Sequence, residues 1–193
     1  VQDDAPYTYA GANGKSVNNY DRRYRGFTTL REAITDSINI VTVKTLAQAG
    51  VSLGWQYVQE YGFTTVDSRD MNEALALGGI TQGVSNLELT AAYAAIANQG
   101  TYIKPKFYTK ILDHDGNVLI DNTTPESHTV IKDTTAWLLT SAMEDVMTSG
   151  TGTSAYFGSS MAQAGKSGTT TSSRDALFAG YTPYYTCAVW GGY

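Results

Sequence analysis

The stretch MAQAGKSGTTTSSRDALFAGYTPYYTCAVWGGY, residues 161–193, decides the fold. Short apolar runs alternate in it with Gly, Ser and Pro, which predicts three antiparallel strands at about 162–169, 176–182 and 185–192. The sequence upstream is dominated by helical signals, so helices come first and a small sheet comes last. This order predicts an α+β domain in which a cluster of helices packs on an antiparallel sheet.

The first helical region is interrupted near a short polar segment. A threonine cap at residues 28–29 is followed by helix formers as far as Ile34, which predicts a helix start. Residues 36–39, with the sequence DSIN, interrupt it because Asp, Ser and Asn side chains compete for backbone hydrogen bonds. Helical character then resumes up to Gly50. We therefore expect Ser37 and Asn39 on a turn between two helical pieces.

Three further helices are expected, each running from a capping side chain toward a glycine: Ser52 to Gly62, Ser85 to Gly100 and Asp133 to Gly150. The second has a capping box and is apolar almost all round, so we expect it to be buried on every side. Residues 1–27 and 64–82 are predicted to be irregular. The dipeptide Asp115-Gly116 between apolar runs predicts a hairpin.

Composition excludes several classes of protein. A chain of 193 residues is long enough for one domain with a sizeable core. The net charge of −5 leaves no basic surplus for a nucleic acid, and Arg22, Arg23 and Arg25 form only a short local cluster. No apolar run approaches the roughly 18–20 residues that cross a bilayer. We therefore expect any membrane anchor or export signal to lie outside this sequence.

The sharpest local motif, residues 165–170 with the sequence GKSGTT, has three interpretations. A phosphate loop is disfavoured because Ser160 stands where its first glycine belongs, and no helix is expected to follow. The motif is also compatible with a polar turn between strands. Alternatively, it lies on an exposed strand edge beside an active site. There Lys166 attracts a carboxylate, hydroxyls two positions apart bind it, and Gly168 lets a substrate backbone approach.

Other reactive side chains are better explained as structural. His114 and His128 are expected in loops, as solvated residues and not as parts of a triad or metal site. Cys187 is the one cysteine, so no internal disulfide forms, and a packed thiol is expected. Trp137 and Trp190 are expected to fill the core. No cofactor and no metal are predicted.

Two motifs resemble those of one enzyme superfamily. Residues 166–169 are similar to the Lys-Thr/Ser-Gly motif of penicillin-binding proteins and serine β-lactamases, and Ser37-Ile38-Asn39 matches their Ser-X-Asn motif. The order and separation of the two motifs also agree. The resemblance extends to segments typical of bifunctional class A penicillin-binding proteins: residues 19–21, 29–33, 76–79, 83–89, 97–100, 150–152, 175–183 and 188–193.

The sequence departs from the pattern of this family in one respect. The family's nucleophile is the serine of a Ser-X-X-Lys motif, and no serine here has a lysine three residues later. By resemblance, the fold is β-lactamase/transpeptidase-like, and the first strands of the sheet and the last helix lie outside this sequence. Residues 1–193 are thus expected to be a single partial domain, truncated at both ends, which is accompanied by a missing N-terminal segment and is inactive alone.

The resemblance implies a D,D-transpeptidase that cross-links peptidoglycan stem peptides, binds β-lactams, and works on the extracytoplasmic side of the bacterial membrane. It implies that the complete polypeptide, of which this sequence is a part, is also a peptidoglycan glycosyltransferase. The resemblance further implies catalytic roles for Ser37, Asn39 and Lys166, and substrate binding by Ser167, Gly168, Thr169 and Thr170. Alternatives are a D,D-carboxypeptidase, a serine β-lactamase, or a non-catalytic binding or scaffold module. The sequence upstream of Val1 would discriminate, because a Ser-X-X-Lys motif there restores the enzyme.

Overall fold

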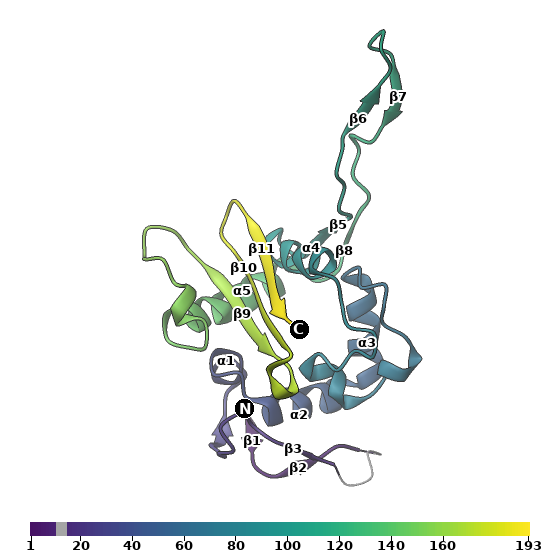
Figure 1. The fold of residues 1–193 in the computed structure, drawn as a ribbon. Helices are drawn as coiled ribbons and strands as arrows, with labels where there is room; N and C mark the ends of the chain where they lie inside the picture. Colours follow the sequence, from purple (N-terminus) through teal and green to yellow (C-terminus); the bar gives the residue numbers. More distant parts are fainter. Residues whose placement is uncertain (11–14) are drawn as a thin grey trace.

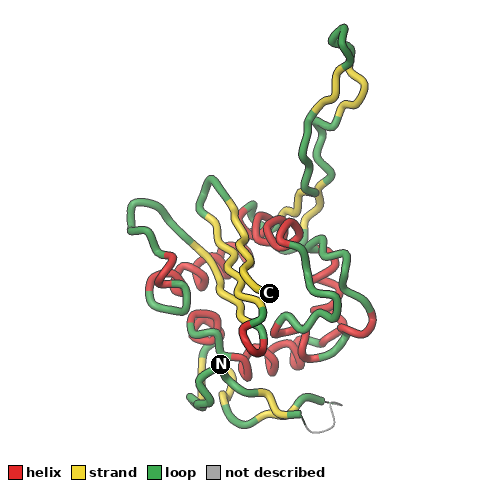
Figure 2. The backbone as a smooth tube through the Cα atoms, viewed as in Figure 1, coloured by secondary structure: helices red, strands yellow, loops and turns green. Residues whose placement is uncertain are grey.

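The computed structural model describes residues 1–10 and 15–193. Its main body is a three-stranded sheet with helices against it, and a long hairpin projects away from this body (Figures 1 and 2). The architecture is α+β, with helices packed on an antiparallel sheet, as predicted.

The sheet consists of the three C-terminal strands. They are β9 (Ala164–Thr169), β10 (Asp175–Tyr181) and β11 (Thr186–Gly192), arranged in the order β11-β10-β9 with antiparallel pairing. In this register Ala179, in the middle strand, lies opposite Lys166 on β9 and Ala188 on β11. All three predicted strands are therefore confirmed, with ends shifted by only one or two residues.

Five α-helices are present in the described part of the chain: α1 (Leu30–Thr35), α2 (Asn39–Ala49), α3 (Val51–Glu60), α4 (Asn86–Ala97) and α5 (Asp133–Thr148). Helices α4 and α5 pack against the sheet, and α1 packs against α5 and α2. None of the helices in residues 1–10 and 15–193 combines the length and the apolar character needed to cross a membrane.

One of the three helix caps expected after Gly50 is confirmed by the structure. Ser85 forms the predicted capping box with Glu88 and begins α4. Two other expected caps are wrong. Ser52 lies inside α3, which follows directly on Gly50, a residue with a positive φ of 104° that suits glycine. Asp133 is the first helical residue of α5 and not its cap.

Helix α4 is not buried on every side. Its buried residues are alanines, at positions 91, 92 and 95, whereas Leu87 in its first turn is 45% exposed. The neighbours of α4 therefore cover only part of its apolar surface.

One part of the core lies between α4, α5 and the sheet. Met143 from α5 packs with Ala164 and Tyr181 from the strands, and Tyr93 from α4 lies against them. A second buried cluster, made of Ala33, Ile38 and Val41, joins α1 to α2. It fixes the connection between these two helices, which contains Ser37.

The two expected core tryptophans and the expected packed thiol are exposed. Trp137 is 68% exposed because it follows Ala136, which is on the buried face of α5, and the next residue of a helix points about 100° away. Trp190 is 48% exposed and its indole donates to Asp175. Cys187 is exposed on β11. No described element covers that side of the strand closely enough to bury it.

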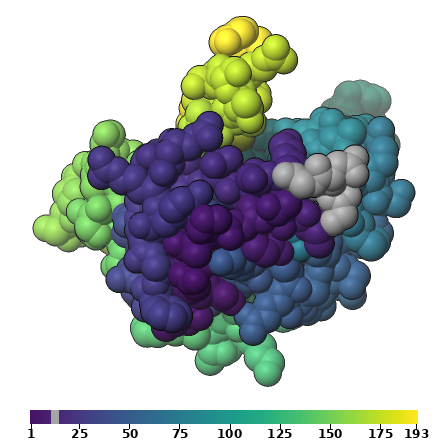
Figure 3. Space-filling model, turned by 90° about the horizontal axis from the view of Figure 1, so that it is seen from below, coloured from purple at the N-terminus to yellow at the C-terminus, as the bar shows by residue number. Residues whose placement is uncertain are grey.

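The segment predicted as N-terminal loop contains short strands. They are β1 (Gln2–Asp4), β2 (Tyr7–Thr8), β3 (Ser16–Val17) and β4 (Gly26–Thr28), with β1 paired to β4 and β2 to β3. Residues 11–14 of this predicted loop fall outside the described residues. Seen from below, the N-terminal strands β1 to β4 lie across the face of the helices that follow them (Figure 3). Residues 64–82 are irregular, as expected, apart from two short 3-10 helices, η1 (Ser68–Asp70) and η2 (Glu73–Leu77).

The predicted hairpin is confirmed and forms the projecting arm (Figure 1). Its tip strands are β6 (Lys110–Leu112) and β7 (Val118–Asp121), and its base strands are β5 (Thr101–Ile103) and β8 (Ser127–Thr129). His114 lies exposed at the tip, as predicted. His128 belongs to β8 and not to a loop: its Nε2 lies 2.8 Å from the Glu60 carbonyl oxygen and its ring lies beside that of Tyr102.

Candidate active site

Two residues that lie far apart in the sequence, Ser37 and Lys166 of strand β9, are in contact. The Lys166 ammonium donates to the Ser37 Oγ at 2.8 Å, although 129 positions separate them in the sequence. Both side chains are partly buried. The structure therefore brings together the Ser-X-Asn segment and the Lys-Ser-Gly strand, as the resemblance implies.

Ser37 reverses the chain between α1 and α2. Its φ of 57° is left-handed, a conformation that is uncommon for a residue with a side chain and costs of the order of 1–3 kcal/mol. The next residue, Ile38, is completely buried, and its backbone N–H donates to the Ala33 carbonyl at 2.9 Å. Burial of Ile38 offsets the strain, so the core holds the Ser37 hydroxyl in its position facing β9.

Asn39 is the first residue of α2, so it opens the helix and does not lie within the turn. Its Nδ2 donates to the backbone carbonyl of Asn18 at 2.8 Å. Because a carbonyl oxygen only accepts, this contact fixes which end of the Asn39 amide faces Asn18. The second N–H of Nδ2 and the Oδ1 atom remain to bind a ligand.

Within the described part of the chain, no carboxylate pairs with the charge of Lys166. None of the ion pairs within residues 1–10 and 15–193 includes Lys166. Burial lowers the pKa of Lys166, because removal from water disfavours the ammonium. A negatively charged ligand would relieve this penalty, so the site favours an anion.

Gly168 keeps the strand beside Lys166 open. The two residues lie on the same face of β9 because strand side chains alternate. A Cβ added at Gly168 would meet only the Cβ of Leu177, at 3.7 Å. A ligand backbone therefore has room to lie close to the strand at this point.

Ser167 and Thr169 share the opposite face of β9. The Ser167 hydroxyl donates to the Thr151 hydroxyl at 2.9 Å, and Thr169 is exposed at the end of the strand. The Thr170 hydroxyl is engaged at the following turn, where it donates to the Asp175 carboxylate at 2.8 Å. The side chains of Thr170 and Ser167 are thus both engaged within the protein, whereas the Thr169 hydroxyl forms no hydrogen bond with the described residues.

Thr151 is a site residue that sequence reasoning missed. Its backbone N–H donates to the Thr35 carbonyl at 3.3 Å, so it contacts both the end of α1 and, through Ser167, strand β9. The fit is tight, since a Cβ at Gly150 would lie 2.2 Å from the Thr35 oxygen. A threonine between two glycines, in the segment 150–152, was the sequence signal for this close approach.

Comparisons with known proteins agree with this arrangement. The family model for the penicillin-binding protein transpeptidase domain matches residues 1–190. Penicillin-binding protein 1F of Bacillus subtilis is 41% identical over 181 residues, which are 91% of this chain. Penicillin-binding protein 1A of Clostridium acetobutylicum is 38% identical over 186 residues, 94% of this chain. The chain spans 24% of the length of the first of these relatives and 23% of the second.

Solved structures show the same fold. The crystal structure of penicillin-binding protein 1A from Haemophilus influenzae superposes on the whole chain, and 34% of that protein is covered, with a TM-score of 0.87 and 24% identity. The penicillin-binding protein PonA1 from Mycobacterium tuberculosis matches 97% of this chain and 52% of its own, with a TM-score of 0.78 and 25% identity. The fold is thus that of penicillin-binding proteins. The chain belongs to the penicillin-binding protein transpeptidase domain family.

Proposed function

We propose that residues 1–193 form the Ser-X-Asn and Lys-Ser-Gly part of the D,D-transpeptidase domain of a class A penicillin-binding protein. The contact between the Lys166 ammonium and the Ser37 hydroxyl carries this proposal, because it joins the two motifs in one site. Membership of the family and the uncompensated charge of Lys166 support it. The acylated serine and its lysine are supplied by a segment outside residues 1–193, and we call the complete polypeptide the parent protein.

In this proposal the reaction is acyl transfer in two steps. The serine of the parent protein attacks the penultimate D-alanine carbonyl of a stem peptide, and the bond to the terminal D-alanine breaks. The hydroxyl proton of that serine passes through its lysine partner and Ser37 to the leaving amine of the terminal D-alanine. An amine of a neighbouring strand then attacks the ester, so that the peptide cross-link forms and the serine regains its proton.

The residues of this chain bind and orient the substrate. Lys166 supplies positive potential toward the terminal carboxylate, and the Thr169 hydroxyl donates to it. The Ser167 hydroxyl donates to it as well once it gives up its bond to Thr151. Asn39 binds the acyl amide of the donor through its remaining amide atoms. The backbone N–H of Thr169 forms half of the oxyanion hole, and Gly168 admits the substrate backbone.

β-Lactams would be accepted as substrate mimics and acylate the same serine. Because the substrate is peptidoglycan, the domain would work on the extracytoplasmic side of the membrane, held by an anchor outside residues 1–193. We also propose that the parent protein carries a peptidoglycan glycosyltransferase domain, as class A relatives do.

Labelling with fluorescent penicillin tests the proposal. We expect covalent labelling of the parent protein and none of residues 1–193 alone, since these contain no acylated serine. An unlabelled, folded parent protein would instead indicate a non-catalytic module. A labelled protein that transfers the acyl group only to water would be a carboxypeptidase or a β-lactamase.

A further inference from the structure

Helix α2, which follows the Ser-X-Asn turn, has no cap of its own. The residue before it is Ile38, whose side chain forms no capping hydrogen bond. The first N–H groups of a helix lack partners within the helix and need them from elsewhere. Here the backbone N–H of Ile40 donates to the Oδ1 of Asn19 at 3.2 Å, and both residues are buried. Asn19 thus caps α2 from 21 positions upstream.

The orientation of Asn19 is fixed by three other contacts. Its Nδ2 donates to both carboxylate oxygens of Asp4, at 2.8 and 3.0 Å, and to the backbone carbonyl of Arg23 at 2.8 Å. A carboxylate and a carbonyl only accept hydrogen bonds, so Nδ2 must face them. Oδ1 then has to face Ile40. Asn19 is 2% exposed, which leaves it no alternative partner in water.

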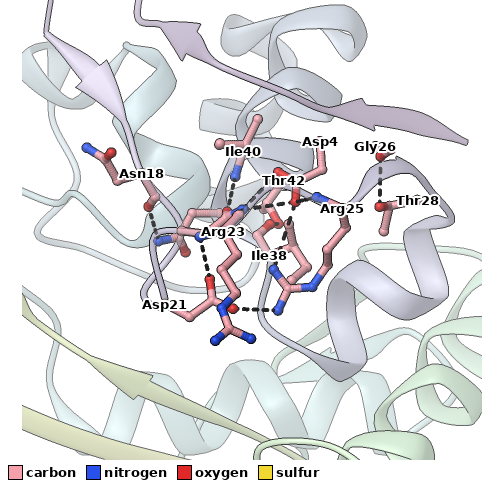
Figure 4. A network of polar contacts seen from close by, with 12 residues as sticks. Asp4, Asn18, Asp21, Arg23, Arg25, Gly26, Thr28, Ile38, Ile40 and Thr42 are labelled. Carbon is pink, nitrogen blue, oxygen red and sulfur yellow. Dashed lines mark hydrogen bonds and ion pairs between the residues drawn. The ribbon is translucent and has the colours of Figure 1, made fainter.

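Asp4 anchors this arrangement. It is fully buried, and a buried carboxylate requires hydrogen bonds and a countercharge. The backbone N–H of Arg25 donates to it at 2.9 Å, and the Arg25 guanidinium lies 3.9 Å away while also pairing with Asp21 (Figure 4). The pairing of β1 with β4 places Asp4 opposite Gly26, next to Arg25.

Two consecutive residues hold the start of α2. The carbonyl of Asn18 binds the Asn39 side chain, and the side chain of Asn19 binds the Ile40 backbone. Ser37 lies in the turn just before these held residues and has a strained, left-handed backbone. Such a conformation persists only where its surroundings determine it fully.

We propose that Asn19, oriented by Asp4, is a positioning residue that holds the Ser-X-Asn turn at its distance from Lys166. This inference rests on the proposed function for its effect on acylation. Its structural part, the capping of α2, is testable separately. Without the cap, the first turn of α2 opens, and the Ser37 hydroxyl and the Asn39 amide lose their fixed positions.

The test compares Asn19→Ala with Asn18→Ala in the parent protein. Asn18 is a matched control because it contributes its backbone carbonyl, which the substitution keeps, and its side chain is exposed. We expect Asn19→Ala to slow labelling by fluorescent penicillin about tenfold to a hundredfold, because a displacement of ~1 Å at a reacting group costs about 10²-fold. The loss should fall mainly on the acylation step, through Ser37, with a smaller loss of non-covalent drug binding, through Asn39. Asn18→Ala should label at the wild-type rate.

Amide hydrogen exchange separates positioning from general destabilisation. Asn19→Ala should lose protection at the Ile40 amide while α4 keeps its protection. If Asn19→Ala does not fold, Asp4→Asn provides a milder test, because the amide keeps one of the two acceptor oxygens. Unchanged acylation in the folded Asn19 variant, or an equal loss in both asparagine variants, would overturn the proposal. A wild-type parent protein that is not labelled would refute the proposed function. Hydrogen exchange at the Ile40 amide would still show whether Asn19 caps α2.

Discussion

Replacement of Lys166 by alanine tests the proposed site most directly. The substitution removes an ammonium that lies 2.8 Å from the Ser37 hydroxyl. A hydrogen bond to a charged group contributes about 1.5–3 kcal/mol, and loss of one electrostatic stabiliser from an active site typically costs about 10²–10³ in rate. Because Lys166 is only partly buried, water screens its charge, so we expect the lower limit. Acylation of the parent protein should therefore slow by about 10²-fold, or ~2.7 kcal/mol.

The assay is the second-order rate of labelling by fluorescent penicillin, measured as a function of pH. Burial lowers the pKa of Lys166, so the ammonium should lose its proton at a lower pH than a solvated lysine. Labelling of the wild type should therefore fall as pH rises through this lowered pKa, and Lys166→Ala should lack this decline. The same shift makes the folded state bind fewer protons than the unfolded state, so stability should rise with pH in the same window.

Lys110→Ala is the matched control, because this lysine is exposed on the projecting hairpin, remote from β9. It should leave both the rate and its pH profile unchanged. Wild-type labelling of a folded Lys166→Ala protein would refute the role that we assign to this charge. So would an alkaline decline that persists in the variant.

Two predictions concern stability. Gly150→Ala should destabilise the fold by about 1–3 kcal/mol in thermal unfolding, because its Cβ would lie 2.2 Å from the Thr35 oxygen; Gly191→Ala, whose Cβ meets nothing within 4 Å, should be neutral, and equal losses would contradict this reasoning. Burial raises the pKa of Glu88, but hydrogen bonds from Thr64 and from the Ser85 cap outweigh it and lower the pKa from 4.5 to about 2. Its stabilisation should be present above pH 4.5 and disappear as pH falls toward 2, so Glu88→Gln should flatten that part of the pH–stability curve. An unaltered curve would rule out this role for the carboxylate.

Features set by neighbouring residues were predictable from the sequence. The capping box at Ser85 and the Asp115-Gly116 turn depend on a few adjacent side chains, and both were located correctly. A shared site for Ser37 and Lys166 was implied by the family resemblance, and the structure places the two side chains in contact. The helical period that places Ala136 on the buried face of α5 turns the next residue, Trp137, toward solvent, so the assignment of Trp137 to the core is wrong.

Other features depend on contacts that no local pattern records. The exposure of Cys187 depends on what covers one side of β11, and strand alternation does not reveal this. The cap on α2 is supplied by Asn19, whose segment reads as a turn-rich loop. Its role is set by a buried carboxylate at Asp4, which the sequence alone gives no reason to expect inside the protein.

The number of residues that separates the two partners of each contact affects the order in which the contacts form during folding. The contact between Asn19 and Ile40 closes a loop of 21 positions, whereas that between Ser37 and Lys166 closes one of 129. Closure entropy grows as (3/2)RT ln n, so the longer loop costs roughly 1.6 kcal/mol more. We therefore expect the bend that presents Ser37 to form earlier in refolding than its contact with Lys166.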